Sequence, residues 1–261
     1  MYTKEQLKED LKKMGLQGTD KIMIHSSYKS IGGVEGGPDA VLDALMEYFA
    51  EGLLMLPTHT WAKMSASYNI FDPKTEPACV GLLPNLFRQR PGVLRSLHPT
   101  HSIAVYGPEA AAYIEGEEDR CGSPCPPDGC WGRLAESGAY ILLLGVVHNR
   151  NTFIHSVEEM MDVPDRLSPE LVTYKLCMPD GSYKEIQAHS HCCSRSRDVS
   201  ANYNKLLQAF YDNGAARKVK FGAADCILCE AAKIKDVVMK VWSHNPQCVL
   251  DYEEIPAQWW Q

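Results

Sequence analysis

A threonine, a histidine and a glutamate recur at intervals of three residues in the segment NTFIHSVEE, residues 151–159. If a helix begins near Asn151 or Thr152, then Thr152, His155 and Glu158 share one face of it. A carboxylate one turn after a histidine fixes the tautomer of the imidazole and leaves its other nitrogen free to take a proton. A neighbouring hydroxyl can hydrogen-bond a carbonyl or an oxyanion. The spacing therefore predicts a general base, and the alternative is an inert pair on a solvated helix face.

Two further polar turns carry candidate residues. In IHSSYKSIGGVEGGPDA, Ser26 and Ser27 follow an apolar run and precede several glycines, a setting in which hydroxyls and backbone amides bind phosphates. The segment lacks GxGxxG and the P-loop motif, so an ordinary glycine-rich loop is the alternative. In VLRSLHPTHSIAVYG, His98, His101 and Ser102 gather beside an arginine and indicate a functional surface. The alternative there is that His98 caps the turn and packs on the following proline.

The elements that must position these turns alternate along the chain. Apolar runs at 20–27, 52–57, 102–108 and 139–147 read as strands, and amphipathic segments at 3–14, 36–51, 82–92 and 108–116 read as helices. Segment 170–190 alternates around a PDGS turn and predicts an antiparallel strand pair. Helices are expected at 202–215 and 229–246. The fold class predicted is α/β, with a mixed, mostly parallel central sheet covered by helices and a small antiparallel strand pair in the C-terminal third.

Charge and hydropathy exclude several classes of partner. The net charge of −7 and the absence of a long basic run argue against nucleic acid and fit a cationic small molecule. No apolar run approaches the roughly 18–20 residues that span a bilayer. The charged opening segment has no signal-peptide core. We therefore expect a cytoplasmic, single-domain protein over residues 1–261, with no membrane partner and a homodimer as one possible assembly.

Ten cysteines raise the question of metal binding. Reduced thiols are the default reading without a secretory signal. Cys226 and Cys229 have Cys-x-x-Cys spacing but lie in AADCILCEAAKI, which we expect to be helical with buried structural thiols. A metal-dependent hydrolase using His98, His101, His155 or the HSHCC cluster at 189–193 is an alternative function. The absence of HExxH and GxSxG motifs counts against common hydrolases.

Five blocks in order resemble the aminoglycoside 3-N-acetyltransferase family, which differs in fold from GCN5-like acetyltransferases. They are IHSSYKSIGGVEGGPDAVLDAL, GLLMLPTHTW, FDPKTEPACVGLLPNLFRQRPGVLRSLHPTHSIAVYGP, GSPC with WGRLAESGAYILLLGV, and NTFIHSVEE. The resemblance covers residues 3 to 255 approximately. It implies transfer of an acetyl group from acetyl-CoA to the 3-amino group of the 2-deoxystreptamine ring of an aminoglycoside, with no metal required.

The resemblance also implies roles for individual residues. The catalytic group is His155 with Glu158 and Thr152, and the coenzyme contacts are Ser26, Ser27, His98 and Ser102. By position, Asp72, Glu159, Asp162 and Asp165 are candidates to bind the cationic acceptor. The chain departs from the family pattern at GVVH, where a second small residue usually precedes the histidine, and in the segments CGSPCPPDGCWG and HSHCCSRS. These departures leave a non-aminoglycoside amine as an alternative acceptor.

Overall fold

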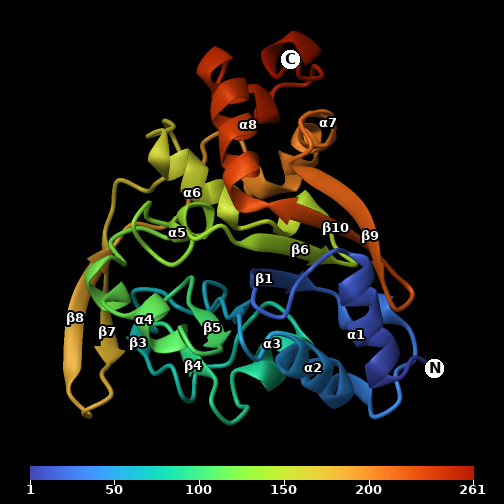
Figure 1. The fold of residues 1–261 in the computed structure, drawn as a ribbon. Coiled ribbons are helices and arrows are strands. Elements are labelled where there is room, and N and C mark those ends of the chain that lie inside the picture. The colour runs from blue at the N-terminus through green and yellow to red at the C-terminus, as the bar shows by residue number, and fades with distance from the viewer.

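A seven-stranded sheet forms the centre of the protein, whose computed structural model describes residues 1–261 (Figure 1). The strand order is β4-β5-β2-β1-β6-β10-β9. The strands are β1 (Lys21–Ser26), β2 (Leu53–Pro57), β4 (Leu94–Arg95), β5 (Ile103–Tyr106), β6 (Tyr140–Leu144), β9 (Ala216–Phe221) and β10 (Ala224–Glu230).

The predicted mixed α/β class is confirmed, but the expectation of a mostly parallel sheet is wrong. β1 pairs in parallel with β2 and β6, whereas the four pairings toward the two edges are antiparallel. The connection between β9 and β10 shows why: it consists of Gly222 and Ala223 alone, and a connection this short joins antiparallel strands. Parallel strands such as β1, β2 and β6 are joined by crossover helices. The alternation of helices and strands in the sequence predicted this parallel part of the sheet and not its antiparallel edges.

Helices cover both faces of the sheet (Figure 1). On one face α1, α2 and α3 pack with residues such as Leu11, Leu45 and Phe87, and on the other α5 to α8 pack with Phe153 and Trp242. Their bounds are α1 (Lys4–Lys13), α2 (Gly37–Tyr48), α3 (Leu82–Phe87), α4 (Ala110–Ile114), α5 (Arg133–Glu136), α6 (Phe153–Met160), α7 (Leu207–Asp212) and α8 (Ala231–His244). No helix combines the length and apolar character needed to cross a membrane.

A smaller sheet lies beside the central one and contains the predicted hairpin. β7 (Val172–Cys177) and β8 (Tyr183–Ala188) pair antiparallel around the PDGS turn, as expected. A third strand that we did not predict, β3 (Ile70–Phe71), adds in parallel to β7. The segment that leaves β8 therefore starts from this second sheet and runs back toward the central one.

Cys226 and Cys229 lie in strand β10 and not in a helix, so that prediction is wrong. β10 is inserted between β6 and β9, and from Cys226 to Cys229 every residue is buried. A short continuous apolar run is compatible with either a buried strand or a buried helix, and the alanines of this one favoured the helix. Both thiols are buried and free, as expected of structural cysteines.

Candidate active site

A cavity of about 680 Å³ opens where the parallel strands β1, β2 and β6 end. Ser26 closes β1, His59 lies two residues beyond β2, and Thr152 lies in the turn that follows β6, and all three line the cavity. The opposite wall comes from the segment after β8, residues 190–200. The carboxyl ends of adjacent parallel strands share one edge of a sheet, which is why separate polar turns meet here.

The predicted face of Thr152, His155 and Glu158 is present on α6. Thr152 directly precedes the first residue of the helix, and His155 Nδ1 lies 2.7 Å from Glu158 Oε2. The side chain of Glu158 is 1% exposed and that of His155 is 14% exposed. The histidine therefore reaches the cavity from a buried carboxylate that orients it.

Two further residues complete the surroundings of Glu158. Arg166 Nε donates to Glu158 Oε1 at 2.7 Å, and the arginine is itself buried. Tyr203 Oη lies 2.8 Å from His155 Nδ1, on the same side of the imidazole as Glu158. Burial alone would raise the pKa of the Glu158 carboxyl, but the contacts from His155 and Arg166 outweigh it and lower that pKa. Glu158 is thus a carboxylate, and because His155 Nδ1–H points to it, Nε2 remains free to take a proton.

The hydroxyl of Thr152 does not cap its helix but lies 3.0 Å from His59 Nε2. His59 is buried, and burial first, then nearby histidines, hold its pKa well below the usual range, so its ring is neutral. The Nδ1 atom of His59 has no partner. The ring of Trp131 packs against the His59 imidazole, with the two ring centroids 5.3 Å apart. The indole N–H of Trp131 donates to the backbone oxygen of His101 at 2.8 Å.

Ser26 and Ser27 differ in their environments. Ser26 Oγ is buried without a hydrogen-bond partner and lines the cavity, so it is available to a ligand. Ser27 Oγ accepts a hydrogen bond from Ser30 Oγ at 2.9 Å and does not line the cavity. The Nε2 atom of His25, next to Ser26, is likewise buried and unpartnered.

His98 and Ser102 lie behind the cavity wall. Both backbone N–H groups of Thr100 and His101 donate to His98 Nδ1, and His98 Nε2 hydrogen-bonds to the backbone oxygen of Ser123. Ser102 Oγ donates to the backbone oxygen of Thr58 and accepts from Arg95. Neither side chain lines the cavity, so a coenzyme contact by either stays a prediction. Their observed role is to hold the loop that places His101 in the wall.

The four predicted acceptor carboxylates are not all brought together. Glu159, Asp162 and Asp165 line a smaller neighbouring cavity of about 250 Å³, which shares Glu158 and Arg166 with the main one. Asp72 lies apart from both cavities and accepts from the Thr75 hydroxyl.

Two of the three carboxylates that line the smaller cavity have protein partners. Glu159 accepts from the Cys125 backbone N–H, and burial raises the pKa of its carboxyl despite that contact. Asp165 accepts from the backbone and hydroxyl of Ser194. A carboxylate that we did not predict, Asp198, lines the main cavity instead.

Sequence reasoning missed several residues of the site. His59 comes just after a predicted strand, as Ser26 does. Its position after the strand could therefore have identified it as a site residue. Arg166 and Tyr203 were also missed: Arg166 lines the cavity from a loop, and Tyr203 contacts His155 from a 3₁₀ segment, and no periodicity or motif in these stretches points inward. Only the path of the chain brings them to α6.

Comparison with known proteins gives the family. The sequence model described as aminoglycoside 3-N-acetyltransferase matches residues 23–243. Aminoglycoside N(3)-acetyltransferase III from a Salmonella species is 30% identical over 90% of this chain and 89% of its own length. A histidine-to-alanine mutant of aminoglycoside acetyltransferase AAC(3)-IVa, in complex with a gentamicin, is 26% identical with a TM-score of 0.78, over 97% of this chain and 95% of that one. AAC-IIIb, as a binary complex with CoASH, shares the fold with a TM-score of 0.77 at 23% identity, over 90% and 94% of the two chains. This chain belongs to the aminoglycoside 3-N-acetyltransferase family and is an acetyltransferase.

Proposed function

We propose that the protein transfers the acetyl group of acetyl-CoA to the 3-amino group of a 2-deoxystreptamine aminoglycoside, with His155 as the general base. The observation that carries this role is the 2.7 Å contact between His155 Nδ1 and the buried carboxylate of Glu158. It fixes the imidazole and leaves Nε2 at the cavity as the proton acceptor. A general base of this kind accelerates a reaction by roughly a hundredfold to ten-thousandfold.

The reaction proceeds in a ternary complex of enzyme, acetyl-CoA and amine. The acceptor amine must be in its neutral form to attack the thioester carbonyl, and His155 Nε2 takes the proton that the nitrogen loses as the C–N bond forms. The C–S bond breaks, and the thiolate of coenzyme A leaves and recovers a proton from the imidazolium or from solvent. Placing both substrates in one cavity supplies much of the remaining acceleration.

Thr152 and His59 act on the acetyl carbonyl. If His59 Nε2 carries the proton and donates to Thr152 Oγ1, the threonine hydroxyl proton is free to hydrogen-bond the carbonyl oxygen, on which negative charge develops. His59 is then a positioning residue. The neutral state that burial imposes on the imidazole allows this tautomer without a competing positive charge.

Positively charged side chains in the cavity bind the coenzyme, and negatively charged ones bind the acceptor. Arg150 and Arg197 line it and form no ion pair within 4.0 Å, so they are available to the coenzyme phosphates, with Ser26 as a polar contact nearby. Asp198 supplies negative charge for the cationic acceptor. Glu159, Asp162 and Asp165 in the adjoining cavity add to the negative potential there.

The test is to incubate the protein with acetyl-CoA and a panel of aminoglycosides and simple amines, and to analyse the products by mass spectrometry. We expect one added acetyl group on the 2-deoxystreptamine ring, and no product with the His155→Ala variant. Isothermal titration should show that this variant still binds coenzyme A. The exposed His244 gives a control, because His244→Ala should keep turnover. Acetylation of simple amines alone would move the acceptor outside the aminoglycosides, and full activity of His155→Ala would overturn the base.

A further inference from the structure

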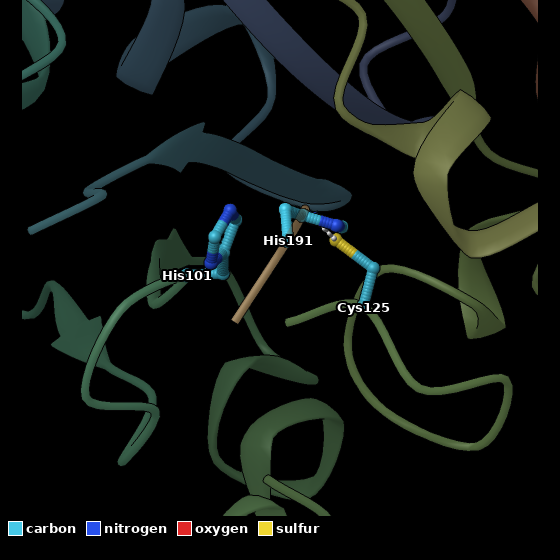
Figure 2. A group of neighbouring side chains, drawn as sticks. All are labelled: His101, Cys125 and His191. Carbon is cyan, nitrogen blue, oxygen red and sulfur yellow. Dashed lines mark hydrogen bonds between the residues drawn. The ribbon is translucent and has the colours of Figure 1, made fainter. Parts of the chain in front are cut away.

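Three side chains that the proposed reaction does not use meet at one side of the cavity: His101, Cys125 and His191 (Figure 2). They come from three separate loops, which precede β5, precede α5 and follow β8. One possible ligand atom from each, two imidazole nitrogens and one sulfur, lies within 4.8 Å of the others. His101 and Cys125 are buried and His191 is half-buried.

The donor set is that of a borderline-soft divalent cation. Two imidazoles and one thiolate suit Zn²⁺, whereas Mg²⁺ and Ca²⁺ require oxygen ligands. Around a tetrahedral zinc ion the ligand atoms lie roughly 3.3–3.8 Å apart, given bonds of about 2.0 Å to nitrogen and 2.3 Å to sulfur. Cys125 Sγ and His191 Nε2 are already 4.0 Å apart, and Figure 2 shows them pointing at each other. Closing the group around an ion needs side-chain movements of about 1 Å.

Second contacts hold the rings in this orientation. The hydroxyl of Thr100 lies 3.0 Å from His101 Nδ1, and the backbone N–H of Cys192, next to His191, donates to the backbone oxygen of Arg166 at 3.0 Å. Outer contacts of this kind orient the ligands of protein metal sites. His101 and His191 also line the cavity, so a fourth position on the ion would face it and take water or a small ligand.

We propose that His101, Cys125 and His191 form a zinc site whose occupation inhibits acetyl transfer. The inhibitory part rests on the proposed function. The His191 ring lies against that of His155, with centroids 4.1 Å apart and the two planes tilted by 31°, so an ion on His191 lies beside the general base. A divalent cation there repels a polycationic acceptor and occupies its space. When the ion binds, the Cys125 thiol forms a sulfur–metal bond and gives its proton to solvent.

Cobalt(II) titration of the metal-free protein tests the site without using activity. One equivalent should produce a near-ultraviolet thiolate-to-cobalt charge-transfer band and the intense visible bands of four-coordinate cobalt. Cys125→Ser should abolish the charge-transfer band. Cys192→Ser is the matched control, because Cys192 is a cavity thiol next to His191 that lies outside the group, and it should keep the band. No band in the unmodified protein, or an unchanged band in Cys125→Ser, would overturn the site.

A second variant guards against misfolding of Cys125→Ser. His191→Asn replaces a half-buried side chain, and we expect it to bind cobalt at least about tenfold more weakly. Unchanged affinity would exclude His191 as a ligand.

The inhibitory part has its own readout. Saturating Zn²⁺ should suppress acetyl transfer by the unmodified protein, a chelator should restore it, and any residual activity of Cys125→Ser should need at least about tenfold more zinc for the same loss. Full turnover with the site filled would refute inhibition and leave the site standing. If no amine is acetylated at all, the proposed function fails, and the cobalt spectrum still decides the site.

Discussion

Arg166 Nε donates to Oε1 of Glu158 at 2.7 Å, on the carboxylate oxygen that His155 does not use. The two donors hold the carboxylate from both sides, and all of this lies within the protein interior except the edge of the His155 ring. The orientation of the proposed base therefore depends on the ion pair between Arg166 and Glu158, which takes no part in the bond changes of the reaction. Arg166 is a positioning residue in this arrangement.

Replacing Arg166 with methionine should lower both activity and stability. The variant leaves a buried carboxylate without its main counter-charge, a loss of about 3–5 kcal/mol in the free energy of unfolding. Its kcat should fall while its KM for acetyl-CoA changes little, because the base loses its orientation and the coenzyme contacts do not change. Denaturant unfolding and steady-state kinetics measure the two effects. Arg166→Lys should recover part of both, and an equal rise in both KM values would argue for a general collapse of the cavity.

The same variant has a defined pH dependence. The pKa of Glu158 is lowered in the folded protein, so the stability it contributes is present above the pKa of the unfolded chain and is lost as the pH falls through the folded value. Removing Arg166 takes away one of the contacts that lower this pKa. Acid unfolding of Arg166→Met should therefore begin at a higher pH than that of the unmodified protein. Superimposable acid transitions, monitored by circular dichroism, would contradict this.

Thr152→Val should reduce kcat by roughly a hundredfold, as expected when one donor to a developing oxyanion is removed. Valine has nearly the same shape, so the binding of both substrates should be retained. Thr152→Ser keeps the hydroxyl and should keep most of the activity. Parallel measurement of kcat and of both KM values separates the role in the transition state from a role in binding. A Thr152→Val enzyme with normal kcat would remove the threonine from the chemistry.

Asp198→Asn should raise the KM for a polycationic acceptor and leave kcat nearly unchanged, since it removes an attraction that acts on the bound amine. The increase should shrink at high salt, where screening weakens contacts between exposed charges. Asp225→Asn serves as the control, because Asp225 is exposed on β10 and pairs with Lys220. Steady-state kinetics at two ionic strengths would reveal either pattern, and a KM that does not change would exclude Asp198 from the acceptor site.

The turns that were identified from the sequence do meet at one cavity, because they lie at one edge of the sheet. The arrangement within one of these turns could be predicted in more detail, because it depends on local spacing. Thr152, His155 and Glu158 are brought together by a single helical segment, so their relationship is already present in the primary structure. Arg166 lies in the loop after α6, and His191 lies in the segment that follows the smaller sheet. Their positions next to α6 depend on how the two sheets pack and not on local spacing. The prediction of a helix at Cys226 and Cys229 was wrong for a related reason. The conformation of β10 is determined by its position between two other strands and not by its alanine content.

Buried neutral histidines should make the protein sensitive to mild acid. Burial lowers the pKa of His25 and of His148 to about 3, whereas in the unfolded chain such a group titrates near 6.5. Between these values the unfolded state binds more protons, so stability falls as the pH drops below about 6.5 and is unaffected by these groups above it.

His148→Phe tests this with a ring that can pack on Phe210 as His148 does. It should reduce the slope of unfolding free energy against pH by up to about 1.4 kcal/mol per pH unit, the contribution of one proton. Urea unfolding from pH 7 to pH 4.5 gives the slope. An identical slope in the variant would show that His148 takes up no proton on unfolding.

The cavity has one wall on the central sheet and the other on residues 190–200, which leave the smaller sheet. In the proposed function, the base His155 lies on α6 and the acceptor-attracting Asp198 lies on this second wall, so the two roles belong to different stretches of the polypeptide. Substitutions in residues 190–200 can therefore change which amine the enzyme modifies while the sequence of α6 stays the same. For an engineer, residues 190–200 other than Arg197, which we assign to the coenzyme, are consequently the place to randomise in a search for new acceptors, with α6 left unchanged.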